Sequence, residues 1–478
     1  MVRRALTGLV LISLVGCAGS GSSSGGSHPS RSTTTTAPGP SDPYYSEAGA
    51  GVYDVGHYDI GLRYSPDQPA ITATTTITAT AKRNLAEFHL DFSGLTIDQI
   101  TVDAAAAGLS RTRTDLTVRP RRAIASGATF VTKIRYHGVP RAIADPGDAS
   151  DDPTRIGWTR TRDGRVYVVS EPIGARTWFP GNDHPADKAT FDIRVDVPDG
   201  VSVASNGTFA PTPGSPGRYT WHWTMAQPMA TYLATVVIAP MREEQTASAA
   251  GVPIRNFFPP RLYDESVTDF ATTGAMIDYF STIFGPYPFD AYGAVVLRDE
   301  IGYALETQTM SIFGSDMLGT DQDAEDTVAH ELAHQWFGDS VSIRRWADIW
   351  LNEGFATYAQ YLWDDHVDPA FDINLEMAKL RAGDERHLTR PHNPGVEGLF
   401  SAATYERGAL TLHALRLTIG DAKFFELVKV WTAKYRYANA TTADFIALTN
   451  EIAGQDLTDF FHRWLDTNQV PPLPKSLL

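Results

Sequence analysis

Cysteine is nearly absent from this sequence, because Cys17 is the only one among 478 residues. A single cysteine cannot pair within its own chain, so we expect a fold without disulfides. Positive charge is also in short supply: 40 lysines and arginines face 56 aspartates and glutamates, which gives a net charge of −16 at pH 7. Nucleic-acid binding requires cations that neutralise phosphates, so this balance argues against a nucleic-acid partner.

Long apolar runs are missing too, apart from one near the N-terminus. Residues 5–15 are apolar and follow two arginines, but they are too few to span a bilayer. This pattern is typical of a signal peptide, here residues 1–16. The run ends in the letters LVGC, which are similar to a bacterial lipobox, where the cysteine, here Cys17, carries the lipid. An ordinary cleavage site that releases the protein is the alternative.

Residues 18–43 consist mainly of Ser, Gly, Thr and Pro, with almost nothing apolar. Such a segment cannot bury a core, so we expect residues 17–43 to form a flexible, lipid-anchored linker. A lipid anchor followed by a linker predicts an exported bacterial lipoprotein at the outer face of the cell membrane, with the membrane as a partner through the anchor.

Short β-strands dominate the next part of the sequence. From Tyr53 to about Ile238 the segments alternate or are rich in β-branched and aromatic residues, and Gly, Pro, Asp and Asn separate them. We therefore predict one all-β domain over residues 44–243, without a helix of note. The predicted strands are residues 57–64, 70–81, 87–92, 96–103, 129–138, 165–170, 190–198, 218–225 and 231–239.

Helical periodicity takes over after residue 243 and predicts an α+β domain over residues 244–478. We expect a small sheet first and helices after it. The predicted elements are a helix over 264–284, strands over 294–297 and, at a sheet edge, 305–312, a helix over 323–339, and helices near 371–386, 402–418, 422–435, 441–453 and 457–467.

A zinc-binding pattern lies in this second domain. His330 and His334 are four residues apart, which on a helix places both imidazoles on one face, so that both reach one ion. Catalytic zinc takes three protein ligands and keeps a fourth position for water, and Glu353, in the letters LNEG, is the natural third ligand. Glu331, between the histidines, can hold the zinc-bound water without being a ligand. We predict one Zn²⁺ per chain.

The alternative to a zinc site is a surface helix with two solvated histidines. The neighbouring residues favour a buried helix instead, and a buried histidine pair beside a glutamate requires a partner for its polar groups. The apolar neighbours are Val328, Leu332, Ala333, Trp336 and Phe337.

From about residue 50 onward the sequence resembles the aminopeptidase N and leukotriene-hydrolase family of zinc metallopeptidases, the gluzincins. Residues 330–334 (HELAH) and 352–354 (NEG) match the family's zinc motif. Residues 303–307 (YALET) stand where the family has its Gly-Ala-Met-Glu-Asn strand, and residues 405–408 (YERG) match its Tyr-Glu-Lys-Gly. Glu171, in the letters EPIGARTWFP, matches the acidic substrate loop of the family's β domain.

This resemblance implies an N-terminal all-β sandwich or saddle domain followed by a thermolysin-like α+β zinc peptidase domain. It also implies roles for individual side chains. Glu331 would take a proton from the attacking water and pass it to the leaving amine, and Tyr405 would donate a hydrogen bond to the oxyanion. Glu171 and Glu306 would bind the α-ammonium group of the substrate. That contact makes an exopeptidase, because an internal peptide bond offers no cation.

The backbone of Ala304 and Leu305 would pair with an extended substrate, as an edge strand does. The sequence also departs from the family pattern. Tyr303 and Thr307 replace the Gly and Asn of the strand motif, so we expect a reshaped pocket for the first side chain. Gln360 stands where the family often has an acid that hydrogen-bonds a zinc histidine, so we expect weaker zinc binding.

The sequence ends soon after residue 465, so we expect the C-terminal helical domain of larger family members to be missing and the site to be open. We predict a zinc-dependent aminopeptidase that acts at the cell surface on peptides with a free N-terminus. The alternatives are a related zinc endopeptidase, and a surface-binding lipoprotein whose catalytic site is spent. Intact motifs argue against the latter.

Overall fold

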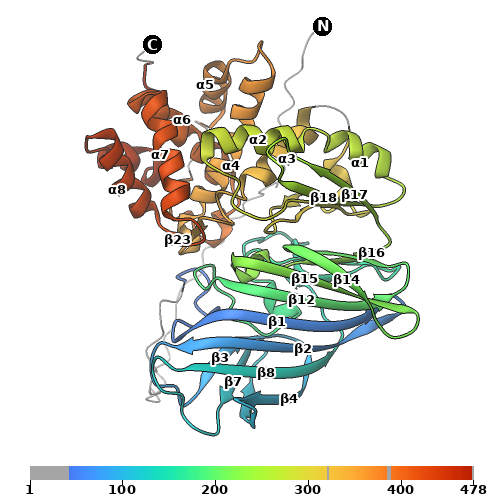
Figure 1. Ribbon diagram of the computed structural model, residues 1–478. Coiled ribbons are helices and arrows are strands. Elements are labelled where there is room, and N and C mark those ends of the chain that lie inside the picture. The colour runs from blue at the N-terminus through green and yellow to red at the C-terminus, as the bar shows by residue number, and fades with distance from the viewer. Residues whose placement is uncertain (1–41, 320–321, 385–388, 476–478) are drawn as a thin grey trace.

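The computed structural model describes residues 42–319, 322–384 and 389–475. The predicted signal peptide, Cys17 and residues 17–41 of the predicted linker lie outside these segments. Figure 1 shows two stacked parts, with the strands of the N-terminal half below and the helices of the C-terminal half above. No helix in the described segments is both long and apolar enough to cross a membrane.

The lower part is built on one broad sheet, which is antiparallel except that β1 (Tyr53–Ser65) and β12 (Ala189–Pro198) pair in parallel. Alternation in the sequence explains its two faces: in β12 every second side chain is buried, and the residues between them are half-buried. The strands in spatial order are β14 (Thr208–Pro213), β15 (Arg218–Met229), β12 (Ala189–Pro198), β1 (Tyr53–Ser65), β2 (Gln68–Ala81), β8 (Thr129–Gly138), β4 (Thr96–Val102) and β5 (Ala105–Ala106).

Two smaller sheets complete the β domain. The predicted strands are present, except that a 3-10 turn over Thr231–Leu233 replaces the start of the last one. The only other helical turn in the described part of this domain is the 3-10 turn Ala175–Thr177. The strands are β13 (Ser202–Ser205), β16 (Val236–Ala239), β11 (Val166–Val169), β10 (Arg155–Arg160) and β9 (Ile143–Ala144) in one sheet, and β3 (Phe88–Asp91), β7 (Asp115–Arg119) and β6 (Gly108–Arg111) in the other.

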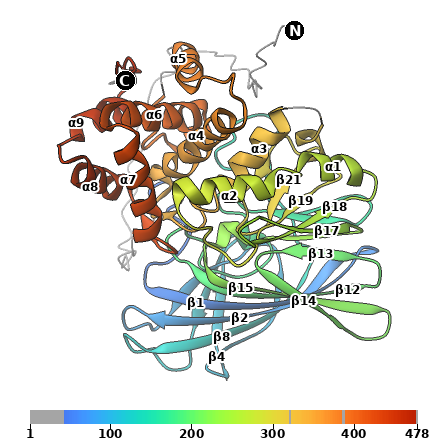
Figure 2. The same ribbon diagram turned by 45° about the horizontal axis from the view of Figure 1, so that its top comes forward.

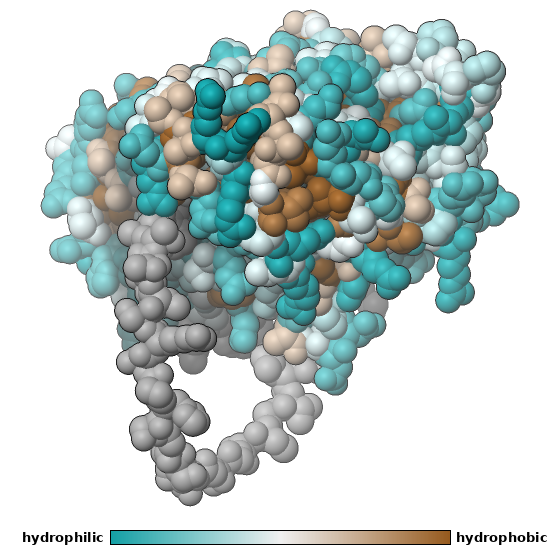
Figure 3. Space-filling model, turned by 90° about the horizontal axis from the view of Figure 1, so that it is seen from below, coloured by the Kyte–Doolittle hydropathy of each residue, from teal (hydrophilic) through white to brown (hydrophobic). Residues whose placement is uncertain are grey.

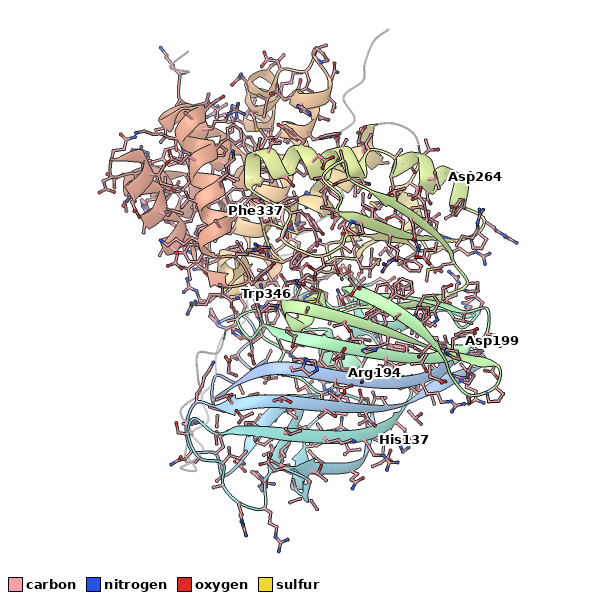
Figure 4. All side chains as sticks on the ribbon, viewed as in Figure 1. His137, Arg194, Asp199, Asp264, Phe337 and Trp346 are labelled. Carbon is pink, nitrogen blue, oxygen red and sulfur yellow. The ribbon has the colours of Figure 1, made fainter. Side chains whose placement is uncertain are left out.

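The outward face of the broad sheet is polar. Figure 4 labels Arg194 and His137 on it, and these side chains pair with Asp59 and Asp98. Seen from below, hydrophilic side chains surround smaller hydrophobic areas on this part of the molecule (Figure 3). The apolar core therefore lies between the sheets and toward the upper part.

The upper part begins with a small sheet, in the spatial order β17 (Arg242–Ala247), β18 (Pro253–Phe258), β19 (Ala294–Val296), β21 (Ser311–Phe313) and β20 (Ala304–Leu305). β17 crosses the expected domain border at residues 243/244 and pairs with β18. The single strand predicted over residues 305–312 is wrong, because a turn separates β20 from β21 and brings them side by side, with β20 at the edge of the sheet.

The long helix predicted over residues 264–284 is also wrong. α1 (Tyr263–Asp269) ends before Phe270, and α2 (Thr273–Phe284) begins after a turn. Phe270 is buried in this turn and packs edge-on against Phe313 of the sheet, with ring centroids 4.9 Å apart. Anchoring this aromatic ring on the sheet sets the point at which the chain changes direction.

The histidine helix, α3 (Gln322–Ala333), ends at Ala333 rather than near Asp339 as predicted. Directly after Ala333 the N–H groups of Gln335 and Trp336 donate to the oxygens of Leu332 and Ala333, three residues back rather than four, so the chain continues in a tighter turn. His334 therefore lies in the turn directly after α3, still above His330.

The remaining elements are mainly helical, as predicted. Figure 2 shows α7, α8 and α9 at the end of the domain away from α1. The helices are α4 (Trp350–Val367), α5 (Ile373–Asp384), α6 (Gly408–Ile419), α7 (Asp421–Lys434), α8 (Thr442–Ala453) and α9 (Thr458–Phe461), with π-helical turns over Ala403–Arg407 and His462–Asp466.

Trp346 lies where the two domains pack against each other, near the site (Figure 4). Its ring contacts Tyr232 of the β domain at a centroid distance of 5.1 Å and Tyr45 at 6.1 Å. All three side chains are buried. The site described next lies beside this contact and takes residues from both domains.

Candidate active site

The two histidines and Glu353 converge in the structure. Nε2 of His330 and Nε2 of His334 each lie 3.4 Å from Oε2 of Glu353. The two imidazole rings are 4.7 Å apart between centroids. Two imidazole nitrogens and one carboxylate oxygen within 4.8 Å of one another form a donor set that suits zinc.

The other nitrogen of each imidazole is already engaged. Nδ1 of His334 donates to the backbone oxygen of Phe337 over 3.0 Å, and Nδ1 of His330 is 2.9 Å from Oε1 of Gln360. Because both acceptors are oxygens, Nδ1 carries the proton and the lone pair of Nε2 faces the centre of the cluster. The amide oxygen of Gln360 therefore makes the contact with the zinc histidine for which the family often uses an acid.

Glu353 reaches the histidines because two helices cross without side chains between them. A Cβ added to Gly354 would lie 2.8 Å from Cα of Gly408, and one added to Gly408 would lie 2.7 Å from Cα of Gly354. Only glycine permits this approach of α4 and α6. Glu353 and Tyr405 both lie against His330.

Tyr405 lies in the π-helical turn Ala403–Arg407, directly before α6. Its ring stacks on the ring of His330, with centroids 5.9 Å apart and an interplanar angle of 23°. Burial, with Glu353 next in importance, raises the pKa of Tyr405 well above its ordinary value. The phenol therefore keeps its proton and can donate a hydrogen bond. π-helical turns are rare and often occur at functional sites.

Glu331 is buried, with 6% of its surface exposed, and its Oε2 has no hydrogen-bond partner among the described residues. Burial raises the pKa of Glu331 well above its ordinary value, and Glu306 and Glu353 add to the rise. An unpartnered buried carboxyl group next to the metal-binding pair is placed to exchange a proton.

Glu171 and Glu306 come from different domains and meet at Glu353. One oxygen of each of these three carboxyl groups lies within 4.8 Å of the others. Glu171 follows β11 of the β domain, and Glu306 follows β20. Oε1 of Glu171 and Oε1 of Glu306 have no hydrogen-bond partner among the described residues. Burial raises the pKa of Glu171 and of Glu306, and Glu353 adds to both rises.

The whole cluster is short of positive charge. Although burial favours the neutral form, His334 and then His330 lower the pKa of Glu353 to about 2. Two histidines cannot balance the carboxyl groups of this site, so the buried cluster favours cations at two places: between the histidines and Glu353, and between Glu171 and Glu306.

The backbone of Ala304 and Leu305 forms β20, which pairs with β21 and is the last strand of its sheet. Its outer edge can pair with an extended peptide. Because Glu306 follows directly, such a peptide would run toward the carboxyl cluster.

The loop that carries Glu171 depends on a residue that the sequence did not reveal. The guanidinium of Arg176 is buried between Asp91, at 3.4 Å, and Asp183, at 3.5 Å. All three side chains are at most 4% exposed. Arg176 stands in the same loop as Glu171, but its guanidinium pairs with the two aspartates. No motif in the sequence identifies Asp91 as its partner, because the two residues meet only after the sheets form.

Comparisons with known proteins identify the family. The family model "Peptidase family M1 domain" matches residues 269–464, and "Peptidase M1 N-terminal domain" matches residues 55–233. A solved structure of the M1 zinc metallopeptidase from Deinococcus radiodurans superposes with a TM-score of 0.83, at 31% identity, over 91% of this chain and 99% of that chain. The chain belongs to peptidase family M1.

Curated relatives in M1 are larger. Aminopeptidase M1-C of Oryza sativa subsp. japonica is 29% identical over 332 residues, which are 64% of this chain and 37% of that protein. Aminopeptidase N of Streptomyces lividans is 28% identical over 330 residues, 63% of this chain and 38% of that protein. The match thus spans well under half the length of these relatives. A structure described as a two-domain M1 zinc metallopeptidase matches with a TM-score of 0.82.

Membership of a zinc metallopeptidase family implies Zn²⁺, and the residues present fit it. The donors are two imidazole nitrogens and a carboxylate oxygen, and the Nδ1 atoms of both histidines are held by oxygen acceptors. Oε2 of Glu331, the residue directly after His330, is buried without a hydrogen-bond partner among the described residues. His330, His334 and Glu353 are therefore the residues that would hold the ion.

Proposed function

We propose that this chain is a zinc aminopeptidase that releases N-terminal residues from peptides. The observation that supports this activity most strongly is that Glu353 belongs to two clusters at once. It lies within 4.8 Å of nitrogens of His330 and His334, and also within 4.8 Å of oxygens of Glu171 and Glu306. A cation bound by the two latter glutamates would lie at one fixed, short distance from the metal. That distance fits the single residue between an α-ammonium group and the first peptide bond.

Substrate binding would use the edge of β20 and the carboxyl cluster together. An extended peptide pairs its backbone with Ala304 and Leu305 and places its α-ammonium between Glu171 and Glu306. The ammonium supplies the positive charge that these buried carboxyl groups lack, and it offers hydrogen-bond donors to their free oxygens. A peptide with a blocked amine can do neither.

Zinc, when bound, polarises the scissile carbonyl and lowers the pKa of a water molecule. Glu331 takes the proton of the attacking water and delivers it to the nitrogen of the leaving amine. Tyr405 donates a hydrogen bond from its phenolic O–H to the oxygen on which negative charge develops. The raised pKa of Tyr405 supports this role, since the phenol stays protonated at neutral pH.

Related structures support an N-terminal substrate. One M1 zinc metallopeptidase from Deinococcus radiodurans is described as bound to a Tyr-Ser-Ala substrate, and two-domain M1 structures are described as bound to L-arginine or L-tryptophan. We infer that this chain accepts large aromatic and basic N-terminal residues. Tyr303, which replaces a family glycine, would line the pocket for that side chain.

We also propose that the enzyme works at the outer face of the cell membrane, as a lipoprotein attached through Cys17. The support is the sequence alone: an apolar run, the letters LVGC and a long polar linker. Replacing Cys17 with Ser should move the protein from the membrane fraction to the soluble fraction or leave it unprocessed. Unchanged fractionation and molecular mass would show that Cys17 carries no lipid.

The activity is tested with metal analysis and aminoacyl fluorogenic substrates. Purified protein should contain one zinc per chain and should hydrolyse these substrates, and a chelator should abolish the hydrolysis. Glu353→Ala should lose both the metal and the activity. Stoichiometric zinc in this variant, or activity that survives chelation, would contradict the assignment.

A further inference from the structure

Gln335 directly follows the metal-binding residue His334, and its side chain is fully buried, with 0% exposed. The oxygen and the nitrogen of its amide both form hydrogen bonds. Oε1 accepts a hydrogen bond from the backbone N–H of Thr309 over 2.8 Å, and Nε2 donates to the backbone oxygen of Glu306 over 3.2 Å. Both partners lie in the segment 306–310 that links β20 to β21. One side chain therefore joins the metal-binding turn to the turn that carries Glu306.

The turn around Glu306 is not held by its own backbone alone. Thr309 has a φ of +66°, a left-handed conformation that is unfavourable for a β-branched residue. Within the turn, the N–H of Met310 donates to the oxygen of Thr307 over 2.8 Å. From outside, Oγ1 of Thr309 accepts from the N–H of Gly207 over 2.6 Å. The surroundings must impose a strained conformation of this kind.

We propose that Gln335 is a positioning residue that fixes the distance between the metal-binding histidines and Glu306. This inference rests on the proposed function, in which that distance decides that one residue is removed at a time. Gln335 does not contact the metal-binding atoms, and its amide bonds to backbone, not to the carboxyl group of Glu306. It acts on the substrate only through the place where it holds Glu306.

Glutamine suits this position because it offers a donor and an acceptor on one rigid group of the required length. Asparagine carries the same amide on a side chain one methylene shorter, so it cannot reach both backbone groups at once. Methionine keeps the approximate volume and has neither the amide donor nor the amide acceptor. Each change leaves at least one buried backbone group without its partner, so the turn is free to move relative to the metal site.

The test compares two zinc-binding ligands, an amino acid hydroxamate and its analogue without the α-amino group. In the unmodified enzyme the amino form should bind more tightly. Gln335→Met should weaken the amino form about tenfold to a hundredfold, should leave the analogue within about twofold, and should keep the zinc. KM for aminoacyl substrates should rise by a similar factor, with a smaller change in kcat. Gln335→Asn, whose shorter side chain cannot reach both backbone groups, should act in the same direction if the methionine variant does not fold.

Two further variants separate positioning from general destabilisation. Thr449→Val removes a buried hydroxyl of α8, which donates to the oxygen of Phe445 over 2.8 Å, and should not change the ratio of the two affinities. Glu306→Gln and Gln335→Met should have non-additive effects on the amino ligand, because both act through the same carboxyl group.

Equal weakening of both ligands by Gln335→Met, no weakening of either, or additive effects in the double variant would overturn the role of Gln335. A different result speaks against the proposed function itself. If the unmodified enzyme binds both ligands equally well, Glu171 and Glu306 do not bind an α-ammonium, whatever Gln335 does.

Discussion

Gly354→Ala tests whether the crossing of α4 and α6 sets the geometry of the active site. The added Cβ would lie 2.8 Å from Cα of Gly408, 2.9 Å from its carbonyl carbon and 3.3 Å from its oxygen. All of these atoms are backbone, so no side chain can rotate away. Two carbons are comfortable at about 3.5–4.0 Å, so the helices must separate by about 0.7–1.2 Å.

This separation has two measurable consequences. Overpacking a close contact costs about 1–3 kcal/mol of stability, so the midpoint of thermal unfolding should fall. Glu353 precedes the added methyl group, and Tyr405 lies on the turn before α6, so the distance between the metal and the oxyanion donor should change. A misplacement of about 1 Å costs about 10²-fold in rate, so kcat should fall by about that factor.

The assay is steady-state kinetics on an aminoacyl substrate, with zinc content and thermal unfolding measured on the same samples. Gly383→Ala in α5 is the matched control, because an added Cβ there meets nothing within 4 Å. This control should keep kcat and should not lower the unfolding midpoint. If Gly354→Ala lowers the midpoint but keeps kcat within about twofold, the glycine contact packs the helices without positioning the catalytic groups.

Three other changes probe single groups. Glu331→Gln keeps the shape but cannot accept a proton, so kcat should fall by about 10²–10⁴ with zinc retained; near-normal kcat would remove Glu331 from the mechanism. Gln360→Glu gives Nδ1 of His330 a charged acceptor, so the affinity for zinc, measured by competition with a chelator, should rise about tenfold. Equal affinities would show that the amide of Gln360 orients His330 as well as a carboxylate does. Burial raises the pKa of Asp187 from 3.8 to about 7, so the folded chain holds a proton that the unfolded chain loses between these values. The contribution of Asp187 to stability is therefore present at low pH and is lost as pH rises through about 7. The free energy of unfolding should fall less between pH 4 and 7 in Asp187→Asn than in the unmodified protein. Identical slopes for the two proteins would contradict this.

Local patterns in the sequence were enough for much of this architecture. Alternation predicted the long strands of the β domain, because one face of each is buried. The spacing of His330 and His334 and the position of Glu353 predicted three groups that the structure brings within 4.8 Å. These features depend on residues close in sequence, or on a motif whose chemistry is specific.

Features that depend on tertiary contacts were missed. The break at Phe270 follows from its contact with Phe313, and the turn between β20 and β21 depends on Thr309 in a left-handed conformation. The amide of Gln335 and the contact of Gly354 with Gly408 join segments that no local pattern relates. Such residues hold the predicted groups in place, and only the folded structure reveals them.

The central claim is that Glu171 and Glu306 select a free N-terminus beside a catalytic zinc. Parallel kinetics on one peptide, with a free and with an acetylated N-terminus, test it most directly. We predict efficient removal of the first residue from the free peptide and negligible cleavage of the acetylated one. Glu306→Gln should lower kcat/KM on the free peptide by a factor that corresponds to about 2–4 kcal/mol of lost transition-state binding. It should not improve cleavage of the acetylated form. Equal cleavage of both peptides by the unmodified enzyme would contradict the claim.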